Sequence, residues 1–336
     1  MTIKAAGGSP PTNSLSFFEI EAEFGSNSER SLGDYRLTQN VGELSNLPLD
    51  SGVPTSGEIK FSDFYSKKLN VVVDCHTGGD EFHKNAKNDK WNNNNITVIG
   101  GFRSKKESGS KIIIHVNKKF GSDKTNQNRC ALRTGSWNST SSVQIDVGSS
   151  GKILGAGGNG GSGATGNSRG GDGADGTSGL GIEVNNTTVN IVSGGIIRAG
   201  FGGGGGGGGG RQVDKGQDRK SSGGGGGGGQ GFPGGSKGAP GGSGGNTTAA
   251  NDNATAGDES EAGEGGTANS NAGETIGGSG GEGGSFGEAA NNGNSSSQSG
   301  GSGGGDGAAI RRTSGYNVTI NNSGTIQGNT TATNVD

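Results

Sequence analysis

The sequence has little of what an ordinary globular core requires. Of its 336 residues, 25% are hydrophobic and 5% are aromatic, well below the composition of a typical soluble domain. Its two cysteines, Cys75 and Cys130, are far apart and define no disulfide framework. No apolar run is long enough for a membrane span, and we expect no signal peptide. The sequence therefore predicts neither a disulfide-stabilised scaffold nor a membrane-spanning segment.

Positive charge is missing from one long stretch, although the formal net charge is only −3. Between Gly238 and Ile310 there is no lysine or arginine, but there are nine acidic residues. We expect an acidic distal face that is solvated; binding of a basic receptor loop or of calcium is the alternative, and no spaced ligand set supports calcium. Residues 67–133 are rich in lysine and arginine, but carboxylates are interleaved and no reader motif is present. We therefore expect no nucleic-acid partner.

Little in the sequence supports catalysis. The densest polar cluster, residues 74–83, contains Cys75, His76 and His83 among several carboxylates. Its spacing matches no standard zinc pattern, and a Cys75–His76 nucleophile lacks a visible orienting partner and pocket. His115 alternates with isoleucine on an expected strand and is interpreted as structural. We predict no catalytic residue, no metal site and no cofactor.

What the chain has in abundance is glycine, with 79 residues, most of them between Gly155 and Gly307. Many of these glycines fall into runs of period three. The runs are Gly157, Gly160, Gly163, Gly166; Gly170, Gly173, Gly176, Gly179; Gly235, Gly238, Gly241, Gly244; and Gly278, Gly281, Gly284, Gly287. A polyproline-II-type helix has three residues per turn, so every third residue lies on one edge, and bare edges let neighbouring chains approach closely. The period predicts a block of packed polyglycine-II strands held by N–H···O bonds and Cα–H···O contacts.

Two other structures are compatible with so much glycine. A disordered linker is the usual interpretation of such composition, but the regular period and the length of the tract argue against it. Collagen requires an unbroken, proline-rich Gly-X-Y register, whereas this register slips and the tract holds only Pro233 and Pro240. We therefore favour an ordered block whose recognition chemistry lies in its turns.

An internal repeat brackets the glycine tract. Each copy has two short runs of β-branched residues joined by a Gly/Ser/Asn turn, which predicts a hairpin or a solenoid corner. The copies are Val143–Ile145 with Gly151–Ile153, Val189–Ile191 with Gly195–Ile197, and Val318–Ile320 with Gly324–Ile326. We infer that the three copies pair into a small β platform from which the glycine block projects.

The chain before the repeat divides into two parts. Residues 69–154 predict a small β domain, with strands at 69–74, 96–99, 111–116 and 130–133 and a core supplied by Trp91, Trp137 and Phe102. Residues 1–68 contain two similar phrases, at 31–35 and 56–65; we expect this segment to be too small for a core of its own and to dock on a partner. The glycine domain then spans 155–307, including the strand pair 189–197, and residues 308–336 return to the platform. The predicted fold class is mainly β and polyglycine-II, with almost no α-helix.

Three segments resemble a known family. The phrase GEIKFSDFY at 57–65 is similar to an N-terminal phrase of tail proteins from tailed bacteriophages. The segment ALRTGSW at 131–137, with the hairpin at 143–153 and GAGGNGG at 155–161, resembles the region before the glycine tracts of glycine-rich tail-tip proteins. The tract itself resembles the polyglycine-II sandwich of distal tail-fibre adhesins of T-even-like phages. The front end departs from those adhesins, which leaves the mode of attachment open.

The resemblance implies that loops between the glycine strands contact a host receptor and that the N-terminal part attaches to the virion. Loops on a rigid scaffold are where recognition residues accumulate, so the candidate loops are 211–222, 246–256 and 288–299; plain solvated turns are the alternative. Phe201 is interpreted as a cap of the block, whereas Phe232 and Phe286 are either caps or apolar anchors. The candidate receptor-binding residues are Arg211, Lys215, Arg219, Lys220, Phe232, Asn246, Asn251, Phe286 and Asn291. The candidate virion-attachment residues are Phe17, Phe18, Phe24, Tyr35, Phe61, Phe64 and Tyr65.

The function that these observations favour is a non-enzymatic adhesin at a phage tail or fibre tip, assembled in the host cytoplasm. Its expected partners are a bacterial surface receptor, either an outer-membrane protein or a polysaccharide, and other tail or fibre proteins. The chain is expected to act as a homotrimer or as a monomer capping a trimeric fibre. The alternative from another class is a secreted ice-binding or surface-coating protein, which thermal hysteresis would reveal.

Overall fold

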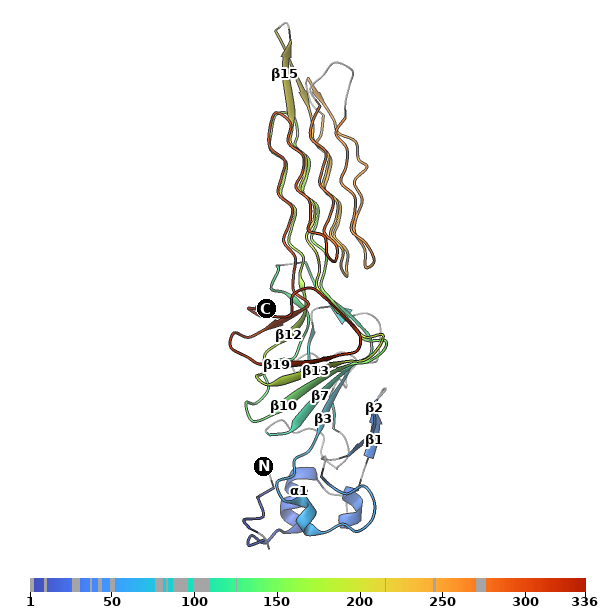
Figure 1. Cartoon of the computed structure of the whole chain (residues 1–336), viewed down its shortest axis with the longest axis vertical. Helices are drawn as coiled ribbons and strands as arrows, with labels where there is room; N and C mark the ends of the chain where they lie inside the picture. The colour runs from blue at the N-terminus through green and yellow to red at the C-terminus, as the bar shows by residue number, and fades with distance from the viewer. Residues whose placement is uncertain are drawn as a thin grey trace.

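The computed structural model describes residues 3–8, 11–25, 31–36, 38–41, 44–48, 52–75, 81–82, 84–86, 96–98, 109–124, 126–214, 216–243, 246–269 and 276–336. Three parts follow one another along the long axis of the molecule: a small N-terminal module, a β-solenoid and a glycine-rich block (Figure 1). The described elements are almost all strands, so the predicted class, mainly β with almost no α-helix, is confirmed. None of the helices in the described part is long and apolar enough to span a bilayer.

The N-terminal module is built around its own apolar core. Its elements are the helix α1 (Phe17–Phe24), the 3₁₀ turns η1 (Leu32–Tyr35) and η2 (Phe61–Phe64), and the antiparallel strands β1 (Thr38–Val41) and β2 (Leu44–Pro48). The buried side chains are Ile3, Ile20, Phe24, Tyr35, Val53, Phe64 and Leu69. The expectation that this segment is too small for a core is therefore wrong, because aromatic side chains from distant turns bury each other.

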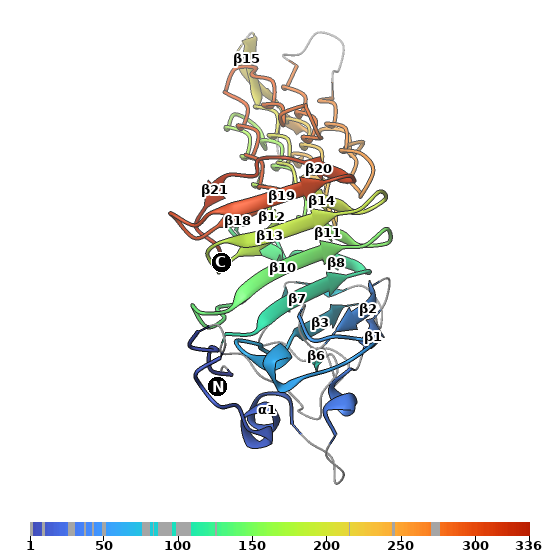
Figure 2. The same ribbon diagram turned by 60° about the horizontal axis from the view of Figure 1, so that its bottom comes forward.

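The middle of the molecule is a three-sided parallel β-solenoid with five turns, which Figure 2 shows as a ladder of parallel strands. The first sheet contains β3 (Val71–Cys75), β7 (Lys111–Val116), β10 (Ser142–Val147), β13 (Thr187–Ile191) and β19 (Val318–Asn322), with β6 (Ile96–Val98) added antiparallel to β3. The second contains β4 (Glu81–Phe82), β8 (Lys119–Gly121), β11 (Lys152–Leu154), β14 (Ile196–Arg198) and β20 (Thr325–Gln327). The third contains β5 (Lys84–Asn85), β9 (Cys130–Arg133), β12 (Ser178–Ile182), β18 (Ile310–Arg312) and β21 (Ala332–Thr333).

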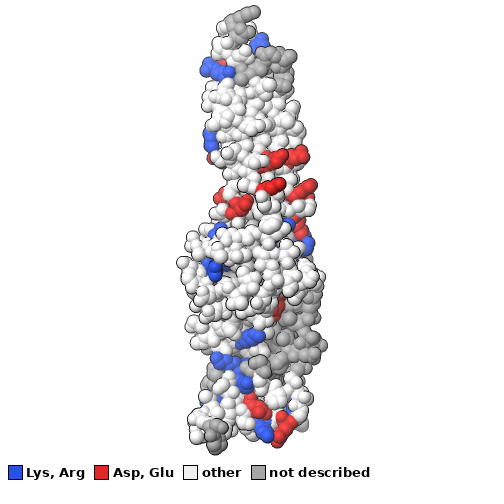
Figure 3. All heavy atoms as spheres, viewed as in Figure 1, with Lys and Arg blue, Asp and Glu red and all other residues white. Residues whose placement is uncertain are grey.

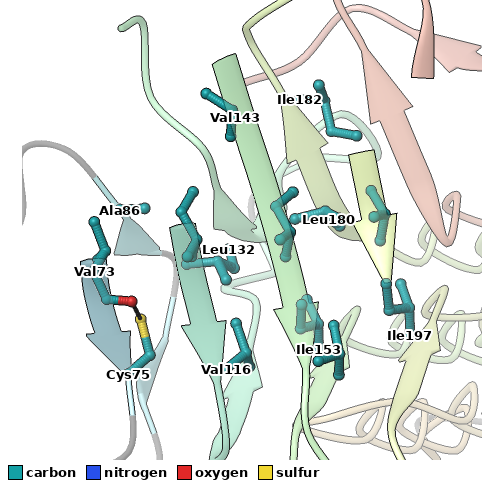
Figure 4. Packing of buried hydrophobic residues seen from close by; sticks show 14 of the residues in the cluster. Val73, Cys75, Ala86, Val116, Leu132, Val143, Ile153, Leu180, Ile182 and Ile197 are labelled. Carbon is teal, nitrogen blue, oxygen red and sulfur yellow. Dashed lines mark hydrogen bonds between the residues drawn. The ribbon is translucent and has the colours of Figure 1, made fainter. Parts of the chain in front are cut away.

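Columns of β-branched residues fill the inside of the solenoid. In the first sheet Ile114 lies beside Ile145, which lies beside Val189, and in the second sheet Ile153 lies beside Ile197. Figure 4 shows Ile153 and Ile197 in one core with Leu132 and Leu180. Ile114, Ile145, Val189 and Trp137 belong to the same cluster. Because successive side chains of a strand face opposite sides, a period of two places every second residue in this core.

The structure selects one of the two forms predicted for the repeated motifs and joins two parts that were expected to be separate. The motifs pair in parallel from copy to copy, so they are solenoid corners and not hairpins. The expected small β domain and the β platform are one continuous solenoid, since β7 pairs directly with β10. Trp91 and Phe102, expected in the core, lie outside the described residues.

The glycine block consists of two excursions from the solenoid. Residues 155–177 leave after β11 and return to β12, and residues 199–309 leave after β14 and return to β18. Backbone N–H groups bond across the block at every third residue: those of Gly157, Gly160 and Gly163 donate at 2.8–2.9 Å to the carbonyls of residues 233, 236 and 239. The central strands of the block consist of glycine because the neighbouring strands leave no space for a Cβ atom. A Cβ built on Gly204 would lie 2.1 Å from the Gly281 carbonyl oxygen.

The block has a proximal end against the solenoid and a distal end that is free (Figure 1). Its proximal turns are 230–233, 258–261 and 285–288, and Gln230 connects them by donating its side-chain amide to the Ser260 carbonyl and accepting from the Phe286 N–H. Near the distal end lie the antiparallel pair β15 (Gly210–Asp214) and β16 (Gln217–Ser221) and the short strand β17 (Thr247–Thr248). Phe201 is buried at the proximal end, where a cap was predicted.

Charge is distributed differently from the sequence-based expectation. Figure 3 shows carboxylates gathered on the half of the block next to the solenoid and lysine or arginine at the distal end. Glu259 demonstrates this placement, because it accepts hydrogen bonds from Lys119 at 3.1 Å and Lys152 at 2.7 Å, both on solenoid strands. The expected acidic distal face is therefore wrong: the acidic residues fall mainly in or near the proximal turns.

Candidate functional site

The distal tip brings together chain segments that are far apart in the sequence. Its described residues are 165–169, 210–214 and 216–222 of the hairpin, 242–243, 246–248, Ile276 and 295–298. Each is a place where a glycine strand turns back, so the local cause of the tip is the interruption of the three-residue period by bulkier residues. Residues from several segments therefore share one small surface at the end of the block.

The hairpin formed by β15 and β16 is the most prominent part of the tip. Gly216, with φ of +79°, occupies the turn in a conformation that favours glycine. Arg211 lies opposite Lys220, and Asp218 balances both, 2.9 Å from Arg211 and 3.8 Å from Lys220. Hydrogen bonding from Arg211 lowers the pKa of Asp218, so this carboxylate stays ionised. On the same hairpin Val213 is 62% exposed, which makes the hairpin surface amphipathic.

Hydrogen bonds connect the hairpin to its neighbours. The Arg211 N–H donates to Ser297 Oγ at 2.8 Å, and the Lys220 N–H donates to the Asn246 carbonyl at 3.0 Å. Ser222 Oγ accepts from the Gly166 N–H at 3.2 Å and donates to the Gly242 carbonyl at 2.7 Å. Gln298 donates to Asn167 at 3.2 Å. The tip is thus a cross-bonded surface and not a set of independent loops.

The structure places four of the predicted receptor-binding residues at this tip: Arg211, Arg219, Lys220 and Asn246. Asn251 lies on the strand that leaves the tip, where its side chain donates to Thr267 at 3.1 Å. Lys215 lies outside the described residues.

Three predicted receptor-binding residues are placed elsewhere. Phe232 lies at the proximal end, where its ring stacks on Phe82 with centroids 5.3 Å apart. Phe286 lies on the proximal turn 285–288, and Asn291 lies on the strand that follows, its N–H bonded to the Glu282 carbonyl at 2.9 Å. These placements correct the expectation that they form part of a distal tip. The interruptions that contain them look the same in sequence as those at the distal end.

Sequence reasoning missed residues 165–169 as part of the site. Arg169 lies there, paired with Asp172 at 2.6 Å, and Asn167 belongs to the cross-bonded surface. The available signal was weak: the glycine spacing widens from three to four residues between Gly166 and Gly170. This is the same kind of interruption that marks the hairpin, on a smaller scale.

The predicted attachment residues divide between core and surface. Phe24, Tyr35 and Phe64 are buried in the N-terminal core, which corrects their assignment as contact residues. Phe17 and Phe61 pack edge to face with centroids 4.9 Å apart and are partly buried, and the Tyr65 hydroxyl donates to the Asn13 carbonyl. Phe18 is 75% exposed. Of the seven residues, Phe18 is the one with a large exposed apolar surface.

Metal and thiol chemistry find no support in the described part of the chain. There, no group of three His, Cys, Asp or Glu side chains lies close enough to hold a metal ion. Cys75 and Cys130 are both buried and form no disulfide, and burial raises the pKa of the Cys130 thiol to about 12. His76 and His83, from the polar cluster considered for zinc, lie outside the described residues.

A solenoid that supports a rigid, loop-bearing glycine block defines a fibrous protein built to hold an exposed surface at its free end. Residues 81–331 match the family model described as phage tail fibre adhesin Gp38. Because that match covers most of the chain, the chain belongs to this family. It is a tail fibre adhesin, a component of the phage tail that binds a host receptor and other tail proteins. The comparisons with curated proteins and with solved structures found no match.

Proposed function

We propose that this adhesin recognises its host through the distal tip, displayed by a polyglycine-II block. The support for the block is the hydrogen bonding at every third residue and the close approach of bare glycine edges. A scaffold of this kind uses almost no side chains for its own stability, so the tip residues are free to vary. The Gp38 family match supports the adhesin role, and adhesins act by binding and not by catalysis.

The observation that carries the proposal is the convergence of separate segments into one exposed, cross-bonded surface. Within it, Arg211, Arg219 and Lys220 supply positive charge, and Val213 and Ile276 supply exposed apolar area, being 62% and 56% exposed. Arginine and apolar anchors surrounded by hydrogen-bonding groups are the usual composition of an energetically important interface centre. The tip therefore suits a receptor surface that is partly acidic and partly apolar.

The test shortens the hairpin without changing the scaffold. Residues 212–219 are replaced by an Asn-Gly turn, which keeps Arg211 and Lys220 at the ends of a two-residue hairpin loop. We expect the variant to fold normally but to lose binding of labelled adhesin to host cells, and phage carrying it to adsorb poorly. The matched control is Phe286→Ala, an exposed residue at the proximal turn, which should bind as the original chain does. Unchanged adsorption by the shortened variant would contradict the proposed role of the tip.

We further propose that the N-terminal module docks the adhesin on another tail protein, with Phe18 in the contact. The support is its 75% exposed ring on a module whose other aromatic residues are largely packed. Phe18→Ala should reduce incorporation into virions while leaving binding of the free protein to cells intact. Incorporation is measured by mass spectrometry of purified particles.

A further inference from the structure

We propose that one corner of the solenoid carries a second binding site, for an uncharged hexose unit of a saccharide. The loops that precede β10, β13 and β19 lie side by side at this corner, as Figures 1 and 2 both show. Between them is a pocket of about 520 Å³ lined by residues 137, 139–142, 183–186 and 316. It is distant from the distal tip and has no part in the proposed receptor-binding role of that surface.

The pocket wall is held in place by its own hydrogen bonds. Trp137 Nε1 donates to the Thr134 carbonyl at 2.8 Å, which fixes the indole at the pocket edge. Gly135, with φ of +79°, makes the turn and donates its N–H to Glu183 Oε2 at 2.9 Å. The Glu183 N–H in turn donates to Thr134 Oγ1 at 2.9 Å. The segment 131–137, which stood out in the sequence, is therefore a rigid bracket that joins two solenoid turns and positions one wall of the pocket.

The chemistry of the lining favours a sugar ring. Tyr316 and the small exposed part of Trp137, which is 6% exposed, provide apolar aromatic surface. Hydroxyls of residues 139–142 and the amides of Asn185 and Asn186 provide donors and acceptors. Asn185 Oδ1 already accepts from the Asn186 and Asn317 N–H groups, at 2.9 and 2.8 Å, which directs its amide. A pocket of this size with a few oriented polar groups is typical of small-ligand sites.

The charge of the lining narrows the ligand class. Among the described residues that line the pocket, Glu183 is the only charged one, and Arg133 lies 3.8 Å from its carboxylate. Arg133 pairs with that carboxylate but is not among the residues that line the pocket, so a phosphate or another anion would find no cation in the described lining. A lipid chain would leave the hydroxyl and amide groups unpaired at a cost in free energy. An uncharged ring with hydroxyl groups on its rim and C–H groups on its face satisfies both kinds of surface.

The test uses the full chain and four methyl glycosides, those of glucose, galactose, mannose and N-acetylglucosamine. Trp91→Phe leaves Trp137 as the only tryptophan, so its fluorescence reports on the pocket wall. We expect at least one glycoside to change this fluorescence saturably and to receive saturation transfer from the protein in NMR. Ser139→Phe, which fills the pocket from an exposed loop position, should weaken that binding by about tenfold or more, equivalent to about 1.4 kcal/mol.

Two further variants distinguish binding in this pocket from binding elsewhere on the chain. Ser150→Phe places the same side chain on an exposed turn between β10 and β11, at another corner, and should leave glycoside binding unchanged. Tyr316→Ala removes apolar wall without filling the pocket and should weaken binding. The proposal is overturned if none of the four glycosides binds saturably below about 100 mM, or if Ser139→Phe binds as well as Ser150→Phe. The shortened tip variant should bind glycosides normally, so failure at one site is distinguishable from failure at the other.

Discussion

At the scale of single residues, the joint between solenoid and glycine block depends on a few long side chains. Lys119 and Lys152 hold Glu259 of a proximal turn at 3.1 and 2.7 Å. The Lys119 ammonium also lies 4.0 Å from the centre of the Phe232 ring, which stacks on Phe82. Charge and aromatic packing together fix the base of the block, because glycine strands have no side chains with which to do so.

Phe232→Ala tests the role that the structure assigns to this aromatic. Loss of the stacked pair and of the contact with Lys119 should lower the free energy of unfolding by about 1–3 kcal/mol. Thermal or denaturant unfolding measures this. Receptor binding by the folded protein should not change, because the ring lies at the opposite end of the block from the tip. A loss of binding at full stability would instead support an exposed anchor at this position.

Glu259 should make the joint sensitive to acid. Burial alone raises the pKa of Glu259, but hydrogen bonds from Lys152 and Lys119 outweigh it, and the pKa lies below its usual value. A lowered pKa means that the stabilising contribution is complete above the unfolded-state value of about 4.3 and is lost as the pH falls through the folded-state value. We therefore expect Glu259→Gln to be less stable than the original chain at neutral pH. The difference in melting temperature should shrink steadily below pH 5.

Residue-level prediction from sequence failed where a partner comes from elsewhere in the chain. The Phe232-Pro233 dipeptide predicts an exposed, stiff tip just as well as a packed base, because its stacking partner Phe82 is remote in sequence. Arg211 and Lys220 were easier to identify, since they interrupt two long glycine runs and such an interruption must lie at a turn. Composition identifies turns but does not say at which end of the block they lie.

At the scale of elements, the period of the sequence pattern identifies the type of strand. The glycines identify the edges along which neighbouring strands touch. Strands β7 and β9 begin and end at the predicted residues. Both are short runs that are buried at almost every position, which is the pattern of a strand covered on both faces. The parallel pairing of the repeats was left open by the sequence, since the same motif is consistent with a hairpin. In the structure, the glycine tracts between β11 and β12 and between β14 and β18 project outward, and the successive solenoid turns stack on one another. The copies of the motif therefore pair in parallel.

A pair of glycine substitutions tests the packing of the block. Gly204→Ala places a Cβ 2.1 Å from a backbone oxygen, so two strands must separate and the free energy of unfolding should fall by at least about 2 kcal/mol. Gly242→Ala is the matched control, because its Cβ would meet nothing nearer than Thr165 Oγ1 at 3.9 Å. It should change stability by no more than about 0.5 kcal/mol. Equal, small effects at both positions would show that the strands are not packed as described.

At the scale of the whole molecule, the chain is a solenoid with the glycine block inserted into it. The glycine block leaves and re-enters the solenoid twice. Only the strands at these crossings are anchored directly in the solenoid, and the others are joined by turns at both ends of the block. The charge pattern follows this arrangement, with carboxylates near the solenoid and cations at the free end (Figure 3). Under the proposed attachment through the N-terminal module, this tip is the part of the molecule farthest from the virion.

Hydrogen exchange should show directly whether the amides of the glycine block are protected. Apart from residues 202 and 225, the amides of residues 199–209 and 223–231 donate to backbone carbonyls elsewhere in the chain. They should therefore exchange much more slowly than those in the hairpin turn around Gly216. Exchange followed by mass spectrometry measures both regions in the same sample. Rapid, uniform exchange from residue 155 to residue 307 would mean that the tract is a flexible chain.

The amino-acid sequence alone identifies the building units: glycine at period three for strands that touch along bare edges, and β-branched residues at period two for the solenoid. Both periods are local properties, since each follows from the number of residues per turn of the backbone. The three-dimensional fold establishes which glycine strands are neighbours, which turns lie at the distal tip, and that the N-terminal aromatic residues form a core. Glycine edges are chemically identical, so the sequence cannot select among partners. The choice is made by where the solenoid anchors each strand and by the few side chains, such as Glu259 and Phe232, that pack at its base.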